Sequence, residues 1–272
     1  MISRFRPSAL FARAPRSRAI SPLLVLVMLT FTLLTRACAA PPNLEPFAAA
    51  THELTNTARA LGPKVKSTLQ MANLPTQVDR FERAWSARVK ALESLNRYAD
   101  DLNSIAQSAQ TQPERLRRYS DSLAALASAF SPVPGNVAIF AAASSAADLL
   151  SLQAARARAN SSLAHAAAAA LPSVDLLTDA LRDDLLDIEE LIQTCHAAAL
   201  LQPGATDQSV HIDAAFAHAL DTIRTLREAL HAWKGLHAAA VKAISSNTEP
   251  DAREVETAAA RLRSLIQKAG GQ

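Results

Sequence analysis

Residues 207–246 read DQSVHIDAAFAHALDTIRTLREALHAWKGLHAAAVKAISS, and this stretch decides the fold. It contains no proline, and its apolar residues recur alternately four and three positions apart. That spacing places them on one face of an α-helix, which would be roughly 60 Å long at about 1.5 Å per residue. The predicted inner face consists of Ile212, Phe216, Ala219, Ile223, Leu226, Leu230, Trp233, His237, Ala240 and Ile244.

A second row of apolar residues, Leu220, Leu236 and Val241, widens this face, so more than one neighbouring helix must cover it. The rest of the chain has the same character, because alanine and leucine dominate and only six of its 272 residues are glycine. Strand-type alternation is scarce. We therefore predict an all-α fold, an elongated up-and-down helical bundle with coiled-coil-like seams, preceded by an N-terminal signal segment.

The N-terminal segment has the pattern of an export signal. Residues 1–22 contain five arginines and no acidic residue, and the uncharged run LLVLVMLTFTLL follows at 23–34. This run has the length of a signal-peptide core and is too short to span a bilayer comfortably. Two processing routes fit the residues behind it. Either Ala37-Cys38-Ala39 is cleaved after Ala39, or Cys38 is lipidated, since the segment resembles the lipobox of bacterial lipoproteins.

Arg36 before Ala37 and Thr35 in the usual place of leucine depart from the lipobox pattern. An uncleaved anchor and an organellar transit peptide are the other readings of the segment, and the apolar run argues against the transit peptide. We expect a leader at 1–39 with cleavage near 37–40, a proline-rich spacer at 40–46 and a helical bundle at 47–272. The protein would be exported to the periplasm or anchored to the membrane by a lipid on Cys38.

Removing residues 1–38 takes away six of the 28 basic residues and leaves 22 against 25 acidic residues, a net charge of −3. The basic isoelectric point of 9.1 is thus a property of the leader. The remainder gives no electrostatic reason to bind nucleic acid. Without Cys38, Cys195 has no internal disulfide partner, and its place on an apolar stripe predicts a small buried side chain.

Local signals divide the remainder into helices. Gly62-Pro63 predicts the end of a first helix that begins at Phe47, with a short amphipathic continuation behind it. Capping boxes begin at Thr76, Thr111 and Thr248 and predict three further helix starts. The expected helices are 47–61, 64–73, 76–109, 111–130, 137–170, 173–201, 207–246 and 248–268.

The segment 137–170 is very rich in alanine, which lets neighbouring helices approach closely. We interpret it as a central helix of the bundle that Pro172 kinks or ends. The alternative function is a membrane-active protein that inserts this segment as a hairpin. Asp148, Arg156 and Arg158 argue against it, because the uncharged stretch 137–147 is too short to span a membrane.

Two groups of side chains are candidates for binding a partner. Asp175, Asp179, Asp183 and Asp187 recur every four residues and would form an acidic ridge, which is either a solvated face or a contact for a cation, a basic partner or arginines of a neighbouring helix. The segments LNRYADDLNSIA (95–106) and LRRYSDSLAALA (116–127) match at an offset of 21 residues. They either present Arg-Tyr-x-Asp twice on a surface, with Tyr98 and Tyr119 as contacts, or resemble each other as ordinary seam helices whose tyrosines pack at the rim.

No motif for catalysis is present in the sequence: G-x-S-x-G, a phosphate-binding glycine loop and H-E-x-x-H are all missing. No two histidines are spaced i, i+4, and His211 and His218 would be roughly 10 Å apart on one helix face, too far for one ion without other ligands. His237, on the apolar stripe, should lie at the end of the bundle or have a hydrogen-bond partner. We expect a non-enzymatic scaffold or binding protein of the cell envelope, with an unidentified protein partner and without cofactor, catalytic residue or metal.

Overall fold

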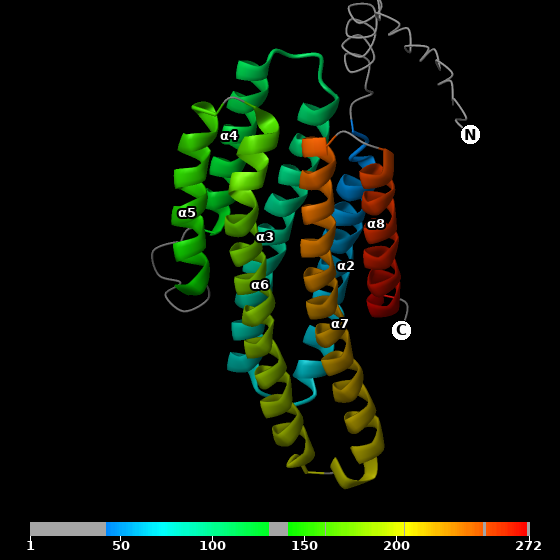
Figure 1. Ribbon diagram of the computed structural model, residues 1–272. Coiled ribbons are helices and arrows are strands. Elements are labelled where there is room, and N and C mark those ends of the chain that lie inside the picture. The colour runs from blue at the N-terminus through cyan, green and yellow to red at the C-terminus, as the bar shows by residue number, and fades with distance from the viewer. Residues whose placement is uncertain (1–41, 131–140, 161, 204, 247–248, 271–272) are drawn as a thin grey trace, which may run out of the picture. The chain divides into compact units, whose positions relative to one another are not determined.

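The computed structural model describes residues 42–130, 141–160, 162–203, 205–246 and 249–270, and the side chains of 141–144, 205–207, 249 and 250 are not described. Seven α-helices and no strand occur among these residues, as predicted for an all-α bundle. Consecutive helices run in opposite directions along the bundle (Figure 1). Their bounds are α2 Glu45–Gln70, α3 Pro75–Gln107, α4 Gln112–Phe130, α5 Ala141–Arg158, α6 Leu163–Leu200, α7 Ala205–Ser246 and α8 Glu249–Gly270.

The helix predicted at 207–246 is α7, and it lies at the centre of the packing. It contacts α6, α8 and α2, while α4 and α5 pack against each other, with α3 beside α4 and α6 beside α5 (Figure 1). Nine of the ten residues of its predicted inner face are buried, and the tenth, Ile244, is partly buried against the same core. The prediction that this face forms the core is therefore confirmed. Cys195 on α6 is also fully buried, and burial raises the pKa of its thiol.

The prediction that Gly62-Pro63 ends the first helix is wrong, because α2 continues through both residues to Gln70. Proline has no backbone N–H, so Pro63 cannot donate to the carbonyl of Arg59 one turn earlier. Both residues lie on the exposed side of α2, where water can donate to that carbonyl instead. Gly62 is buried against α3. A Cβ atom on it would lie 2.4 Å from Nε1 of Trp85, so the glycine makes room for an indole rather than for a turn.

The capping predictions differ in their outcomes. Thr76 does not cap α3, since Pro75 occupies the first turn and Leu74 precedes it without a capping side chain. At the next start the Glu114 carboxylate accepts from the Thr111 backbone N–H at 3.0 Å, which is the acidic half of a capping box. The third box, at Thr248, lies outside the described residues.

The alanine-rich segment is not one helix. The chain leaves α5 after Arg158, and α6 starts behind Ser162, whose hydroxyl accepts from the His165 backbone N–H at 3.3 Å. Pro172 does not end α6. It cannot donate a hydrogen bond to the carbonyl of Ala168, but both residues lie on the exposed side of the helix, where water can donate instead. Within the described residues, none of the helices combines the length and apolarity needed to cross a membrane.

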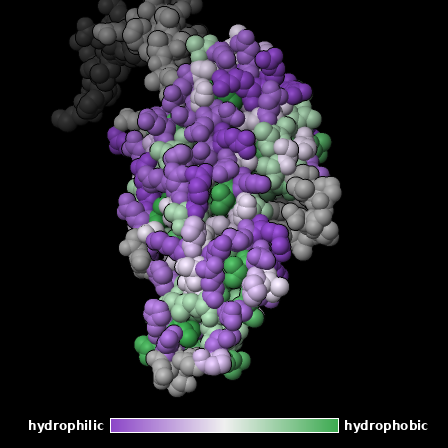
Figure 2. Space-filling model, turned by 180° about the vertical axis from the view of Figure 1, so that it is seen from behind, coloured by the Kyte–Doolittle hydropathy of each residue, from purple (hydrophilic) through white to green (hydrophobic). Residues whose placement is uncertain are grey.

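Hydrophilic residues predominate on the face shown in Figure 2, with hydrophobic ones in separate patches. Large apolar side chains that remain exposed occur on α5, on α6 and directly after it, and in the first turns of α7: Leu149, Leu152, Leu176, Leu186, Leu200, Leu201 and Val210. Single exposed apolar residues of this kind are normal for a folded domain.

Candidate functional site

The row of four aspartates on α6 winds from the interior to the surface. Four residues advance an α-helix by about 400°, so each aspartate is rotated about 40° from the one before and the first and last are about 120° apart. The side chains of Asp175 and Asp179 are about 30% exposed, whereas Asp183 is 58% exposed and Asp187 is also exposed. The row is therefore divided into an inner pair and an outer pair.

The inner aspartates face α7. Lys234 of α7 places its Nζ 2.6 Å from the carboxylate of Asp179, which Arg182 approaches to 3.2 Å from the same helix. Arg182 also donates to Asp183 at 3.0 Å. Asp187 makes no ion pair with any residue that the structure describes. Asp179 thus pairs with a neighbouring helix, although through a lysine and not through the arginine that we expected, and the outer pair is the part that a partner can reach.

Tyr98 and Tyr119 lie together in the interior instead of on a surface, with 1% and 0% of their areas exposed. Their hydroxyl oxygens are 3.3 Å apart, and the Tyr98 oxygen is 3.0 Å from Nε2 of His237. A partner could reach neither ring unless the helices separated. Burial raises the pKa of both phenols, so both stay protonated.

The imidazole of His237 lies between this tyrosine pair and Asp175. Its Nδ1 is 4.0 Å from the Asp175 carboxylate, too far for a hydrogen bond, but the nearby negative charge favours a hydrogen on Nδ1, which leaves Nε2 to accept from Tyr98. Tyr98 then accepts from Tyr119. Burial lowers the pKa of His237 despite the nearby carboxylate, so the ring is neutral at pH 7. The predicted hydrogen-bond partner of His237 is therefore present.

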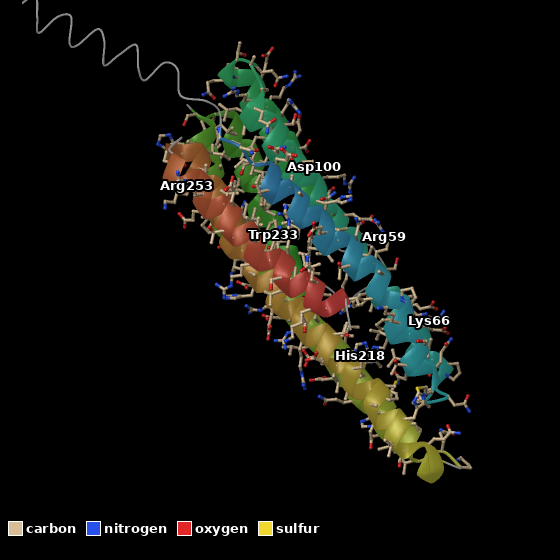
Figure 3. All side chains as sticks on the ribbon, turned by 90° about the vertical axis from the view of Figure 1, so that its right-hand side faces the viewer. Arg59, Lys66, Asp100, His218, Trp233 and Arg253 are labelled. Atoms are coloured by element: carbon tan, nitrogen blue, oxygen red, sulfur yellow. The ribbon has the colours of Figure 1, made fainter. Side chains whose placement is uncertain are left out.

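Trp233 adds a buried hydrogen bond between α7 and α2. Its indole N–H donates to the Thr51 hydroxyl at 2.9 Å, and that hydroxyl donates to the Phe47 carbonyl at 2.8 Å. Figure 3 shows Trp233 at this position between the helices. The ring stacks on His237 with 5.2 Å between centroids and an interplanar angle of 12°. The hydrogen bonds of the cluster thus join α2, α3, α4 and α7 through buried side chains, and Asp175 of α6, which is 31% exposed, lies at its edge.

A buried ion pair joins α3 and α6, and no pattern in the sequence predicts it. Nη2 of Arg88 lies 2.6 Å from the carboxylate of Asp184, and the two side chains are only 4% and 7% exposed. The same nitrogen donates to the Asp184 carbonyl at 2.8 Å. Burial raises the pKa of Asp184 to about 6 and lowers that of Arg88, so desolvation outweighs the attraction between the charges.

Little else among the described residues suggests chemistry. No group of three histidine, cysteine, aspartate or glutamate side chains there lies close enough to hold a metal ion. Cys38, the predicted lipidation site, lies outside the described residues. The chain matches no family model, no curated protein and no solved structure.

Proposed function

We propose that this chain is a non-catalytic scaffold or binding protein of the cell envelope, built as a helical bundle. One observation carries the proposal: the hydrogen-bonded hydroxyls and imidazole of Tyr119, Tyr98 and His237 are enclosed between helices, with 0%, 1% and 0% of their areas exposed. A similar chain in an enzyme would open on a cleft that admits substrate. Here the polar groups hold helices together and leave the outer surface for recognition.

The outer aspartates of α6 are the contact that we propose for a protein partner. Asp183 and Asp187 are exposed, and Glu190 lies one turn away and is exposed as well. Like charges at this spacing repel by about 0.2–0.5 kcal/mol per pair on an isolated helix, so the row contributes nothing to local stability that would account for it. A basic surface would complement it.

A pull-down from solubilised cell envelope tests this contact. The double variant Asp183→Asn/Asp187→Asn should lose the proteins captured by the unaltered chain, because it removes both exposed charges and leaves the inner aspartates in place. The matched control is Asp79→Asn/Glu256→Gln, which removes two exposed acidic charges from α3 and α8. Equal capture by both double variants would contradict the contact.

Export is the second part of the proposal, and it rests on the leader sequence. The apolar run at 23–34 behind five arginines supports secretion, and Cys38 supports either a cleavage site or a lipid anchor. The intact mass of the purified protein distinguishes the routes. Loss of 1–39 corresponds to simple cleavage, a mature chain that starts at Cys38 with added acyl mass corresponds to a lipoprotein, and the full mass contradicts processing.

The alternative function, membrane activity through the alanine-rich segment, is favoured by one observation. Leu149 and Leu152 of α5 are 42% and 45% exposed, so this helix offers apolar side chains outward. Release of a trapped dye from liposomes would measure such activity. The variant Leu149→Ser/Leu152→Ser should abolish release if α5 inserts, while Leu200→Ser/Leu201→Ser on α6 and its C-cap serves as the control.

A further inference from the structure

An open groove of about 690 Å³ follows the outer side of α7, between α6 and α8. Its α7 wall is formed by residues spaced three or four apart, which lie on one helix face. From α8 it receives residues spaced in the same way. The lining consists of Arg182, Arg224, Arg227, Glu228, His231, Ala232, Arg261, Ser264 and Leu265.

A single buried carboxylate holds two of these arginines in place. The side chain of Glu189 is 10% exposed, and its two oxygens lie 3.3 Å from Nε of Arg224 and 2.8 Å from Nη1 of Arg227. Each guanidinium carries five N–H donors, so a single contact to Glu189 leaves four on each side chain. Glu189 therefore reduces the freedom of both arginines without using most of their donors.

The α8 wall supplies a further charge. Arg261 is exposed and forms no ion pair or hydrogen bond with any residue in the described part of the chain, and Ser264 beside it is exposed too. Ala232 and Leu265 are partly buried and give the groove an apolar portion. Guanidinium groups next to an apolar surface suit a ligand with an anionic head and an apolar body.

The charges that line the groove indicate where the anionic end of such a ligand binds. Arg182 already contacts Asp179 and Asp183, so its charge is largely balanced. Glu228, which also lines the groove, disfavours an anion next to it. Among the described residues, Glu189 is the one carboxylate that forms ion pairs with any of Arg224, Arg227 and Arg261.

We propose that this groove binds an organic anion with a carboxylate or phosphate head and an apolar chain, and that Arg224, Arg227 and Arg261 bind the head. Arginine forks match the paired oxygens of both groups. The ligand has two sources, a free amphiphile or the headgroup of an anionic lipid. The inference does not depend on export or on a protein partner.

Isothermal titration calorimetry of the full chain tests the proposal with octanoate and octyl phosphate, and co-sedimentation with phosphatidylglycerol vesicles tests the lipid source. Arg261→Gln should weaken binding about tenfold or more, because it removes charged hydrogen bonds. Since Arg261 has no described partner, its loss should leave the thermal midpoint unchanged. Arg59→Gln, an exposed arginine on α2 (Figure 3), is the control and should bind as the unaltered chain does.

A free amphiphile is the supported ligand if octanoate or octyl phosphate binds saturably, Arg261→Gln weakens that binding and Arg59→Gln does not. The same dependence with vesicles alone would support the lipid source. Binding should also fall as the ionic strength rises, since the arginines are partly exposed. No saturable binding of any probe, or equal binding by both variants, would overturn the proposal.

Discussion

Replacing Gly62 by alanine should destabilise the bundle, although the same change stabilises most helices. Alanine is more favourable than glycine in a helix interior by about 1 kcal/mol. In α2, however, the new Cβ atom would lie 2.4 Å from Nε1 and 2.5 Å from Cδ1 of Trp85. The indole cannot move away freely, because it is 6% exposed and stacks on Phe81 at 5.5 Å between ring centroids.

The magnitude follows from three contributions. Forcing extra volume into a packed core costs about 1–3 kcal/mol. Displacing the indole also breaks its hydrogen bond, because Trp85 donates to the Ala58 carbonyl at 3.2 Å, and such a bond contributes about 1 kcal/mol. After the gain in helix propensity, Gly62→Ala should lower the free energy of unfolding by about 1–3 kcal/mol.

A double-mutant cycle with Trp85→Leu isolates the contact. With the indole gone, Gly62→Ala should stabilise by up to about 1 kcal/mol, so the effect of the substitution changes sign and the coupling energy is about 2–4 kcal/mol. Urea denaturation followed by far-ultraviolet circular dichroism measures all four proteins. If Gly62→Ala stabilised both backgrounds equally, the close approach of Trp85 would be refuted. If it destabilised both equally, the glycine would be required by something other than the indole.

Three further predictions concern the interior. Trp233→Ala should cost about 3–5 kcal/mol in urea denaturation because the ring is fully buried, and a loss below about 1 kcal/mol would show that this face of α7 is not core. Arg88→Met should cost about 3–5 kcal/mol by leaving the Asp184 carboxylate without a partner, whereas adding Asp184→Leu should restore most of that loss; a double variant as unstable as the single one would contradict this. The lowered pKa of His237 means that the unfolded chain binds the proton first as the pH falls, so stability should decrease below pH 6.5 by at most about 1.36 kcal/mol per pH unit. His237→Phe should reduce this slope in denaturation curves recorded between pH 7 and pH 5, and an unchanged slope would assign it to other groups.

The sequence predicts the helices of this fold far better than it predicts their ends. The 4-3 spacing at 207–246 persists over the whole length of α7, so its buried face is evident without any neighbour. Gly62 and Pro63 carry a stop signal that is overridden by Trp85 on another helix and by the solvent exposure of Pro63. The alanine-rich segment has no distinct face, so its division near Asn160 leaves almost no trace in the pattern.

The candidate sites are harder to predict from the sequence than the helices, because they depend on contacts between distant segments. The Tyr98 hydroxyl meets His237 across 139 positions of sequence, and no local pattern indicates that contact. Helix geometry alone predicts that the aspartate row divides between Asp179 and Asp183, since each aspartate is rotated by about 40° around the helix axis from the one before. The arginines at 224 and 227 share a face of α7 that can be seen in the sequence, but the approach of Arg261 cannot.

The indole of Trp233 and the hydroxyl of Thr51 are 182 positions apart in the chain, yet each completes the other's hydrogen bonding. An incomplete chain that stops before α7 therefore leaves Thr51 without its indole donor and α2 without α7 and α8, two of the helices that pack on it. Because α2 packs on α7 and α8 from the other end of the chain, we expect unfolding in a single cooperative transition. Proteolytic cleavage between α6 and α7 should accordingly weaken α2, although it lies far from the cut in sequence.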